Sequence, residues 1–577
     1  MKYLKLPEGK DEREVLDISK LLMKEKIKNL ISEALKKLEI EEVDFSVEHP
    51  EDLSNGDYSS NIALVLAKNM KENPREAAEK IVAQISSIEE IEKIKVAGAG
   101  FINFYLGRDF FGHSLKDISE KKESFGKNQS LAGQKTIVEY TDPNPFKELH
   151  IGHLMSNTIG EAISRVVEAS GAEVKRACYQ GDVGIHAAKS VWGFLKQNDW
   201  QRAYAYGSKM YKESDEVKKE VEEMNKKIYE RSDSEVNSIY DEGKKISLDN
   251  FEKIYQKLGT KFDPGFYFFE SETGTLGKKI VEENIGKIFE KGEKGALVFH
   301  AEKFNKNLHT RVFVNSLGLP TYEAKELGLA KIKYDRYPYD KSIVITGNEI
   351  NEYFKVLLEA MKQVFPELAE KTKHISHGML RLPTGKMSSR TGDVITAHYL
   401  ISLISEKVVE KIKESNRGKM EEGFVNKVAV SALKYSILKQ AIGGDIIYDF
   451  DKSISFEGNS GPYLQYSYVR AKSILEKASG EGISASLKTA TKETSETEKL
   501  LYRFPEVVER SAKEFEPHYI ATFLTELARS FNTYYGNTKI VDKENSASAY
   551  RVALTEAFSV VMKNGLQLLG IESPEKM

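Results

Sequence analysis

Cysteine is almost absent from this chain of 577 residues, which contains only Cys178. A single cysteine excludes an internal disulfide and any zinc site built from several cysteines. Long apolar runs are also missing, since no stretch approaches the ~20 residues of a membrane-spanning helix. The opening "MKYLKLPEGKDEREVLDISK" lacks the apolar stretch of a secretory signal. We therefore expect a cytoplasmic protein that uses no zinc and has no membrane partner.

An excess of positive charge is missing as well. The chain has 85 Lys and Arg against 88 Asp and Glu, a formal net charge of −3. A dedicated nucleic-acid-binding protein is usually basic. The cations can still form local basic faces, so binding to RNA has to be argued from other features.

A chain of 577 residues is too long to fold around a single hydrophobic core, so several domains are expected. Its hydrophobic patterning predicts three parts. Residues 1–125 contain helical and strand-like segments, and predict a small α+β module. Residues 126–400 alternate strands and helices, with a charged helical insertion at about 196–300. Residues 401–577 carry helical periodicity and predict an all-α bundle.

The central part begins with a strand, a helix and a strand in close succession. "KTIVEYT" favours a strand, "GHLMSNTIGEAISRVVEAS" has apolar residues at helical spacing, and "EVKRACYQGD" favours the next strand. This order is a βαβ unit, so we predict an α/β fold with a Rossmann-like parallel sheet.

A first motif lies at the βα junction of this unit, in "PFKELHIGHLMSN" (145–157). Ligands bind beyond the carboxyl ends of parallel strands, and a helix N-terminus favours phosphate. His150 and His153 could donate hydrogen bonds to phosphate oxygens, and Gly152 lets a ligand approach the backbone. The alternative is a turn whose histidines bond only to nearby backbone.

A second motif is the polar segment "LPTGKMSSRTGD" (382–393). Lys386 and Arg390 could neutralise charge on a leaving pyrophosphate, and Ser388 and Ser389 could bond to phosphate oxygens. The alternative is an exposed polar turn.

Together the two segments resemble the "HIGH" and "KMSKS" signatures of class I aminoacyl-tRNA synthetases. The first match is complete, whereas Ser389 stands where that family has its second lysine. Longer stretches resemble the arginyl-tRNA synthetases in particular: "VEYTDPNPFKELHIGHLMSNTIGEAISR", "NGDYSSNIALVLAKNMKENPREAAEKIV", "GAGFINFYL", "PTYEAKELGLA", "FEPHYIATFLTELARSFNTYY" and "LGIESPEKM".

The resemblance implies a reaction and the residues that perform it. Arginine is activated by ATP with Mg²⁺ to arginyl-adenylate and pyrophosphate, and is then transferred to the 2′-OH of the terminal adenosine of tRNA(Arg). Lys147, just before the first motif, is expected to replace the missing second lysine. The expected catalytic residues are His150, His153, Lys147 and Lys386. The expected ATP contacts are His150, Gly152, His153, Lys386, Met387, Ser388, Ser389 and Arg390.

Arginine as substrate makes a chemical demand, because carboxylates best match the five donors of a guanidinium. The expected contacts are Glu139, Asp142, Asn144, Tyr322 and Glu326. Tyr322 and Glu326 are four residues apart, so a helix would place both on one face. The family usually has Tyr and Asp in this pair, so Glu326 is a departure with a longer side chain.

The same resemblance implies that the N-terminal module binds the tRNA elbow and that the C-terminal helices bind the anticodon. Aromatic side chains can stack on unpaired bases. The tRNA-binding candidates are Phe101, Asn103, Tyr463, Gln465, Tyr466, Arg470, Tyr534 and Tyr535. No resident metal site is expected, and the resemblance implies a monomer.

Three alternatives share some of these features. Another class I synthetase, such as a cysteinyl or methionyl enzyme, would commonly carry zinc ligands. A nucleotidylyltransferase shares the histidine turn but would be far shorter. A non-catalytic tRNA-binding paralogue would not need either motif, whereas both are largely intact here.

Overall fold

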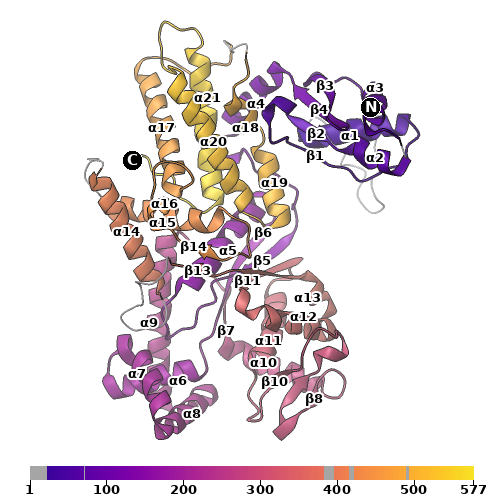
Figure 1. Ribbon diagram of the computed structural model, residues 1–577. Helices are drawn as coiled ribbons and strands as arrows, with labels where there is room; N and C mark the ends of the chain where they lie inside the picture. The colour runs from indigo at the N-terminus through magenta and orange to yellow at the C-terminus, as the bar shows by residue number, and fades with distance from the viewer. Residues whose placement is uncertain (1–21, 71, 383–394, 415–421, 489–492) are drawn as a thin grey trace. The chain divides into compact units, whose positions relative to one another are not determined.

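Figure 1 shows the computed structural model, coloured along the chain from the N-terminus to the C-terminus. Internal contacts divide the chain into two units. The structure describes residues 22–70, 72–382, 395–414, 422–488 and 493–577. The first unit combines Met1–Phe125, Ser473–Glu506 and Thr533–Val561. The second unit combines Gly126–Lys472, Val507–Asn532 and Met562–Met577.

The N-terminal part of the first unit is an antiparallel sheet packed against helices. Its strand order is β1-β2-β4-β3. Residues Ile27, Ile31 and Leu35 recur every fourth position on α1, and all three side chains are buried in the core of this sheet. The elements are α1 (Met23–Lys37), β1 (Val47–Glu48), β2 (Tyr58–Ser60), α2 (Ile62–Met70), α3 (Pro74–Gln84), β3 (Ile91–Ala97), β4 (Phe101–Leu106) and α4 (Arg108–Lys121).

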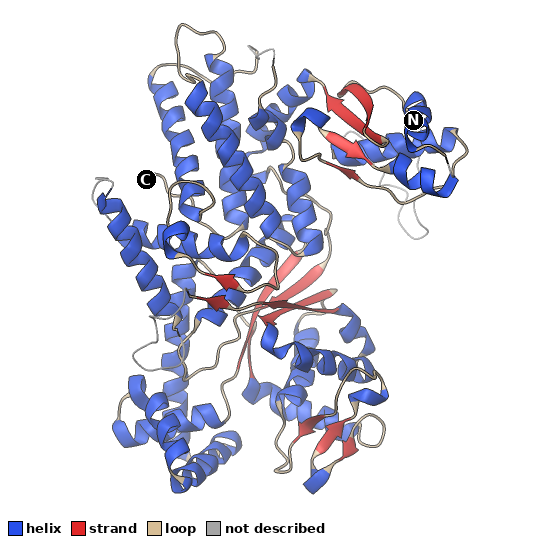
Figure 2. Ribbon diagram, viewed as in Figure 1, coloured by secondary structure: helices blue, strands red, loops and turns tan. Residues whose placement is uncertain are grey.

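The second unit is built on a five-stranded sheet of order β12-β11-β5-β6-β7, in which every neighbouring pair is parallel (Figure 2). Its strands are β5 (Lys135–Glu139), β6 (Glu173–Gln180), β7 (Tyr267–Phe269), β11 (Lys341–Gly347) and β12 (Thr372–His377). Helix α5 (Ile151–Ala169) connects β5 to β6 on one side, and the later strand β11 pairs with β5 on the other. The strand order therefore reverses at β5, which is where open α/β sheets bind ligands.

Helices and a small second sheet follow β6 and β7. Three short strands pair antiparallel in the order β10-β9-β8. The helices end at Leu258 before the aromatic run Tyr267–Phe269 joins the main sheet. The elements are α6 (Ile185–Gln197), α7 (Trp200–Glu213), α8 (Asp215–Glu230), α9 (Ser234–Leu258), α10 (Glu270–Glu283), β8 (Glu290–Lys291), β9 (Leu297–Phe299), β10 (Arg311–Val314), α11 (Tyr322–Arg336), α12 (Asn351–Val364) and α13 (Pro366–Lys371).

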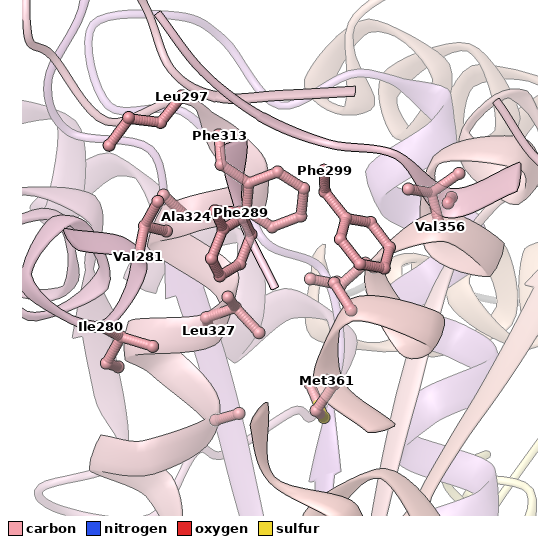
Figure 3. Close-up of a cluster of buried hydrophobic side chains, with 14 of the residues drawn as sticks. Ile280, Val281, Phe289, Leu297, Phe299, Phe313, Ala324, Leu327, Val356 and Met361 are labelled. Carbon is pink, nitrogen blue, oxygen red and sulfur yellow. The ribbon is translucent and has the colours of Figure 1, made fainter. Parts of the chain in front are cut away.

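A hydrophobic cluster fixes the orientation of α11 (Figure 3). Ala324 and Leu327 of α11 are fully buried in it beside Phe289 and Phe313. Glycines also bring α10 and α11 together, since a Cβ at Gly328 would lie only 2.3 Å from the backbone oxygen of Thr273. Because α11 cannot rotate without breaking these contacts, its remaining faces are held toward fixed neighbours.

The rest of the chain is largely helical. A two-stranded parallel pair, β13 (Leu380–Arg381) with β14 (Ile446–Ile447), lies among these helices. The helices are α14 (Ala397–Glu414), α15 (Glu422–Leu438), α16 (Phe450–Ser453), α17 (Gly461–Gly480), α18 (Glu496–Leu501), α19 (Phe504–Glu514), α20 (His518–Asn537) and α21 (Ser548–Leu568).

The predicted fold class is confirmed. The strand–helix–strand order around the first motif forms a parallel sheet, the N-terminal part is α+β, and the C-terminal part is helical. Among the described residues, no helix combines the length and the apolar character needed to cross a membrane.

The α10–α11 contact predicts a large effect for Gly328→Ala. The added methyl would collide with the backbone at Thr273, so we expect a loss of about 1–3 kcal/mol in unfolding free energy. Urea unfolding followed by the fluorescence of Trp192 and Trp200 reports on this unit. As a control, Gly423→Ala in α15 meets no atom within 4 Å and should be neutral or stabilising. Equal unfolding midpoints for the two variants would contradict the contact.

Candidate active site

The turn that starts α5 is held by its two histidines. His150 is the N-cap, and its Nδ1 accepts a hydrogen bond from the Gly152 backbone N–H (3.1 Å). His153 Nδ1 accepts from the His150 backbone N–H (3.0 Å), which completes a reciprocal cap. The two rings lie 3.8 Å apart between centroids. The sequence alternative, histidines bonded to nearby backbone, is therefore part of the structure, but it uses only one nitrogen of each ring.

These bonds fix the proton on each ring. Because both Nδ1 atoms accept, each neutral ring carries its proton on Nε2 and can donate from there. Burial lowers the pKa of His150, and lowers the pKa of His153 well below its ordinary value; the positive charge of Lys147 acts in the same direction on both. Two neutral N–H donors therefore stand at the positive end of a helix, which suits a phosphate.

Lys147 lies in the loop before these histidines, with its ammonium 5.4 Å from the centre of the Tyr204 ring. Its backbone N–H donates to the Asn144 carbonyl (3.2 Å). Its charge reaches both histidine rings, as their pKa shifts indicate. The structure thus places a cation beside the first motif.

The chain that follows the second motif lies against the first motif. Ile151 N–H donates to the Ile395 carbonyl (3.1 Å), and Ala397 N–H donates to the Leu149 carbonyl (2.7 Å). His150 and Thr396 form an antiparallel bridge. The second-motif candidates themselves lie outside the described residues; they are Lys386, Met387, Ser388, Ser389 and Arg390.

The turn directly after β5 has an unusual backbone. Thr141 and Asp142 both have positive φ, at 79° and 44°. For a β-branched residue such as threonine this conformation is strained, and such strain persists only where the surroundings impose it. Two residues of α5 do so: Ser156 Oγ accepts from the Thr141 N–H (2.9 Å), and Asn157 donates to Thr141 Oγ1 (2.9 Å). The turn aims Asp142 Oδ1 at the Tyr179 N–H (2.7 Å).

Acidic side chains collect at this edge of the sheet. Glu139, the last residue of β5, is buried and pairs with Lys333 of α11 (2.8 Å). Burial followed by the negative charge of Glu139 raises the pKa of Asp142 well above its ordinary value, and the same two causes raise the pKa of Glu326 to about 8. The structure thus brings together three of the acids that sequence reasoning proposed for arginine.

The other two arginine candidates lie at this edge in different ways. A Cβ at Gly181 would be 2.3 Å from Asn144 Oδ1 and 3.0 Å from Glu270 Oε1, so these side chains flank the end of β6. Tyr322 begins α11, and its side chain is 59% exposed. Only the half-buried Glu326 of the helical pair faces the other acids.

Several charged residues of the site were missed by sequence reasoning. Lys325 is buried and donates to Glu270 (2.5 Å) and to the Tyr229 hydroxyl (3.0 Å) of α8. Lys333 follows Glu326 by two helical turns, a spacing that could have found it. Glu270 directly follows the aromatic strand β7, and this position at the end of a strand is the sequence signal that could have identified it.

A further acid stands after β11, on the other side of β5. Glu349 is exposed, and its charge raises the pKa of His150 against the larger effect of burial. Within the described ranges, no group of three or more His, Cys, Asp or Glu residues is arranged to hold a metal ion.

The tRNA-binding candidates of the first unit differ in exposure. Phe101 and Tyr535 are each 43% exposed, whereas Asn103 is buried and accepts from Ser59 Oγ (2.7 Å). Tyr534 is half-buried, and burial raises the pKa of its hydroxyl. Stacking on bases thus suits Phe101 and Tyr535, because their rings reach the surface.

The candidates of the second unit lie along α17. Tyr463 accepts a hydrogen bond from the Asn532 amide (3.0 Å). Arg470 donates to the oxygen of the same Asn532 amide, and its guanidinium lies over the Tyr466 ring. Gln465 is fully buried and donates to the Glu572 carbonyl (2.7 Å). Its amide therefore holds the C-terminal segment within the protein.

Comparison with known families gives a match along most of the chain. A family model described as "tRNA synthetases class I (R), catalytic domain" matches residues 115–450. "Arginyl tRNA synthetase N terminal domain" matches residues 25–106, and "DALR anticodon binding domain" matches residues 464–577.

The chain belongs to the arginyl-tRNA synthetase family. An arginine--tRNA ligase of Treponema denticola is 31% identical, over 92% of this chain and 95% of its own length. One of Borrelia hermsii is 30% identical, over 96% of this chain and 99% of its own length. The resemblance and the class of ATP-dependent aminoacyl-tRNA ligase predicted from the sequence are confirmed.

Solved arginyl-tRNA synthetases share the fold. That of Thermus thermophilus matches with a TM-score of 0.75 at 23% identity, over 96% of this chain and 100% of its own. That of Plasmodium falciparum matches with a TM-score of 0.76 at 21% identity, over 96% and 99%. The synthetase fold therefore extends over nearly the whole chain.

The neutral histidine cap predicts a pH dependence of stability. In His153→Asn, the amide oxygen can replace Nδ1 as acceptor but cannot titrate. The pKa of His153 is lowered below 6.5, so below that pH the unfolded chain binds a proton that the native ring refuses. Between about pH 7.5 and about pH 5.5, the wild-type chain should therefore lose about 1 kcal/mol or more relative to the variant. Urea unfolding at both pH values measures the difference; parallel losses would show that His153 titrates normally.

Proposed function

We propose that the chain activates arginine with ATP and transfers it to the terminal adenosine of tRNA(Arg). The observation that supports this most directly is the arrangement at the carboxyl end of β5. Two neutral imidazole donors start α5, and a cluster of acidic side chains lies at the end of the same strand. An anionic nucleotide and a cationic amino acid would thus meet at one edge of the sheet.

In this proposal, ATP binds across the two motifs. His150 and His153 donate from Nε2 to phosphate oxygens, and Gly152 allows close approach to the helix N-terminus. Lys147 supplies the positive charge that the missing second lysine of the second motif would otherwise supply. Lys386, Met387, Ser388, Ser389 and Arg390 are proposed as the remaining contacts.

Mg²⁺ belongs to the proposal as an ion carried by ATP. Bound to the phosphates, it would supply positive charge to the leaving pyrophosphate. The exposed Glu349 carboxylate, whose charge reaches His150, fits a contact with such an ion.

Arginine would bind at this acidic cluster, with the guanidinium at Glu326 and Tyr322. Asn144 with Glu139 and Asp142 would receive the α-amino group. The arginine carboxylate then attacks the α-phosphate in line, and the bond to pyrophosphate breaks. The reaction requires no protein nucleophile, since positioning and charge stabilisation are sufficient. The 2′-OH of the terminal adenosine next attacks the adenylate and releases AMP.

The proposed roles follow the three parts predicted from the sequence. Residues 1–125 would bind the tRNA elbow, 126–400 would carry the chemistry, and 401–577 would bind the anticodon. Phe101 and Tyr535 have the exposed rings that base stacking requires. We propose that the enzyme acts as a monomer in the cytoplasm.

Amino-acid-dependent ATP–pyrophosphate exchange tests this function. We expect exchange with arginine, measured both with and without tRNA(Arg), and no exchange with lysine or citrulline. Citrulline should fail because it would leave the half-buried carboxyl group of Glu326 without a cation. Exchange with a different amino acid, or none with any tRNA, would contradict the proposal and favour one of the sequence alternatives.

The role of Lys147 has a test with a matched control. Lys147→Met keeps the contact with the Tyr204 ring but removes the charge, so kcat for exchange should fall by about 10²-fold. Lys189→Met is the control, since its ammonium also lies over a tyrosine ring, Tyr211 at 4.1 Å. Equal exchange rates in the two variants would remove Lys147 from the reaction.

A further inference from the structure

The proposed arginine site contains more acids than cations. Three of its acids have a partner, at ion-pair distances of 2.8, 2.5 and 3.5 Å. The three pairs are Glu139 with Lys333, Glu270 with Lys325, and Glu323 with Arg311. Within the described part of the chain, no cation lies at ion-pair distance from Asp142 or Glu326.

These two carboxyl groups come from different elements that the fold fixes in place. Asp142 is held by the strained turn after β5 and accepts one hydrogen bond, from the Tyr179 N–H. Glu326 is held by α11, whose neighbouring residue Leu327 is fully buried in the hydrophobic cluster. The turn and the helix therefore fix the backbone positions from which both carboxyl groups project.

The groups that face this pair do not neutralise it. From β5 comes Glu139 and from α11 come Glu323 and Lys333, while α10 contributes Glu270. The phenols of Tyr179 on β6 and Tyr353 on α12 complete the surroundings, and both feel the charge of Glu326. Lys333 is the only cation in this set, and it is paired with Glu139.

An unpaired carboxylate in such surroundings is costly, and a proton removes the cost. Burial is the first cause of the raised pKa of both groups, and negative neighbours are the second. In the proposed function the guanidinium meets Glu326 and the α-ammonium meets Asp142, and both cations prefer ionised carboxylates. The substrate and the stored proton are thus competitors for the same oxygens.

We propose that the Asp142–Glu326 pair holds a proton in the free enzyme and releases it to solvent when arginine binds, a coupling that rests on the proposed function. The step breaks one O–H bond of a carboxylic acid, gives the proton to the buffer, and leaves a carboxylate paired with the substrate cation. Arginine affinity then rises with pH, by up to about tenfold per pH unit, until the free pair is ionised. A neutral isostere such as citrulline brings no cation to Glu326, so this member of the pair also selects for charge.

Isothermal titration of arginine into the full chain tests the coupling. At about pH 7, titrations in phosphate and in Tris differ in heat by the number of protons released times the difference in buffer ionisation enthalpy. We expect about one proton released per arginine bound by the wild-type chain. Glu326→Gln should release far less and bind arginine more weakly, and Asp142→Asn should also lower the number. Glu367→Gln, which removes an acid of α13 that is paired with Lys371 and lies outside this set, should release as many protons as the wild-type chain.

The outcomes separate the two proposals. Arginine binding without proton release, or unchanged release in both Glu326→Gln and Asp142→Asn, overturns the coupling and leaves the proposed function in place. No arginine binding by the wild-type chain, even with ATP and tRNA(Arg) present, overturns the proposed function itself. Circular dichroism of each variant confirms that a loss of binding is not a loss of fold.

Discussion

An imidazole can accept a hydrogen bond only while one nitrogen is unprotonated, and the active site depends on that constraint. The backbone N–H groups of His150 and Gly152 each require an acceptor, and the two rings supply it. The same bonds require an unprotonated Nδ1 on both rings and leave the proton of each neutral ring on Nε2. Helix capping thus uses one nitrogen of each ring, and the proposed contact with phosphate would use the other. The strained turn, the parallel register of β5 with β11, and the segment after the second motif are arranged around this helix start.

Local patterning predicted the part of the fold that places this helix start. The β5–α5–β6 unit follows from apolar residues at strand and helix spacing over about 45 residues, and a parallel pairing leaves few alternatives for the connection. The helices α7–α9 follow from the dense Lys and Glu pattern that predicts a charged helical insertion. The position of β7 does not, because a three-residue aromatic strand becomes recognisable only once β6 is available to pair with it.

The site was predictable in its acids but not in its charge balance. Glu139 and Asp142 follow from their place at the end of the first predicted strand, and Glu326 follows from its position four residues after Tyr322, where the family usually has Asp. The cations Lys333 and Lys325 belong to α11, and only tertiary packing brings this helix close to the acids. Burial was equally hidden from the sequence: Asn103 and Gln465 are polar, yet both satisfy internal partners. Periodicity indicates which face of an element is apolar, and a buried amide on that face looks the same as an exposed one.

The hydrogen bond from Lys325 to Tyr229 joins α8, a helix rich in Lys and Glu, to Glu270, an acid beside the proposed arginine site. Removing that phenol would leave Lys325 balanced by Glu270 alone, and the field felt by the amino acid would change. If arginine binds as proposed, a helix that carries neither signature motif therefore contributes to the charge balance of the amino-acid site.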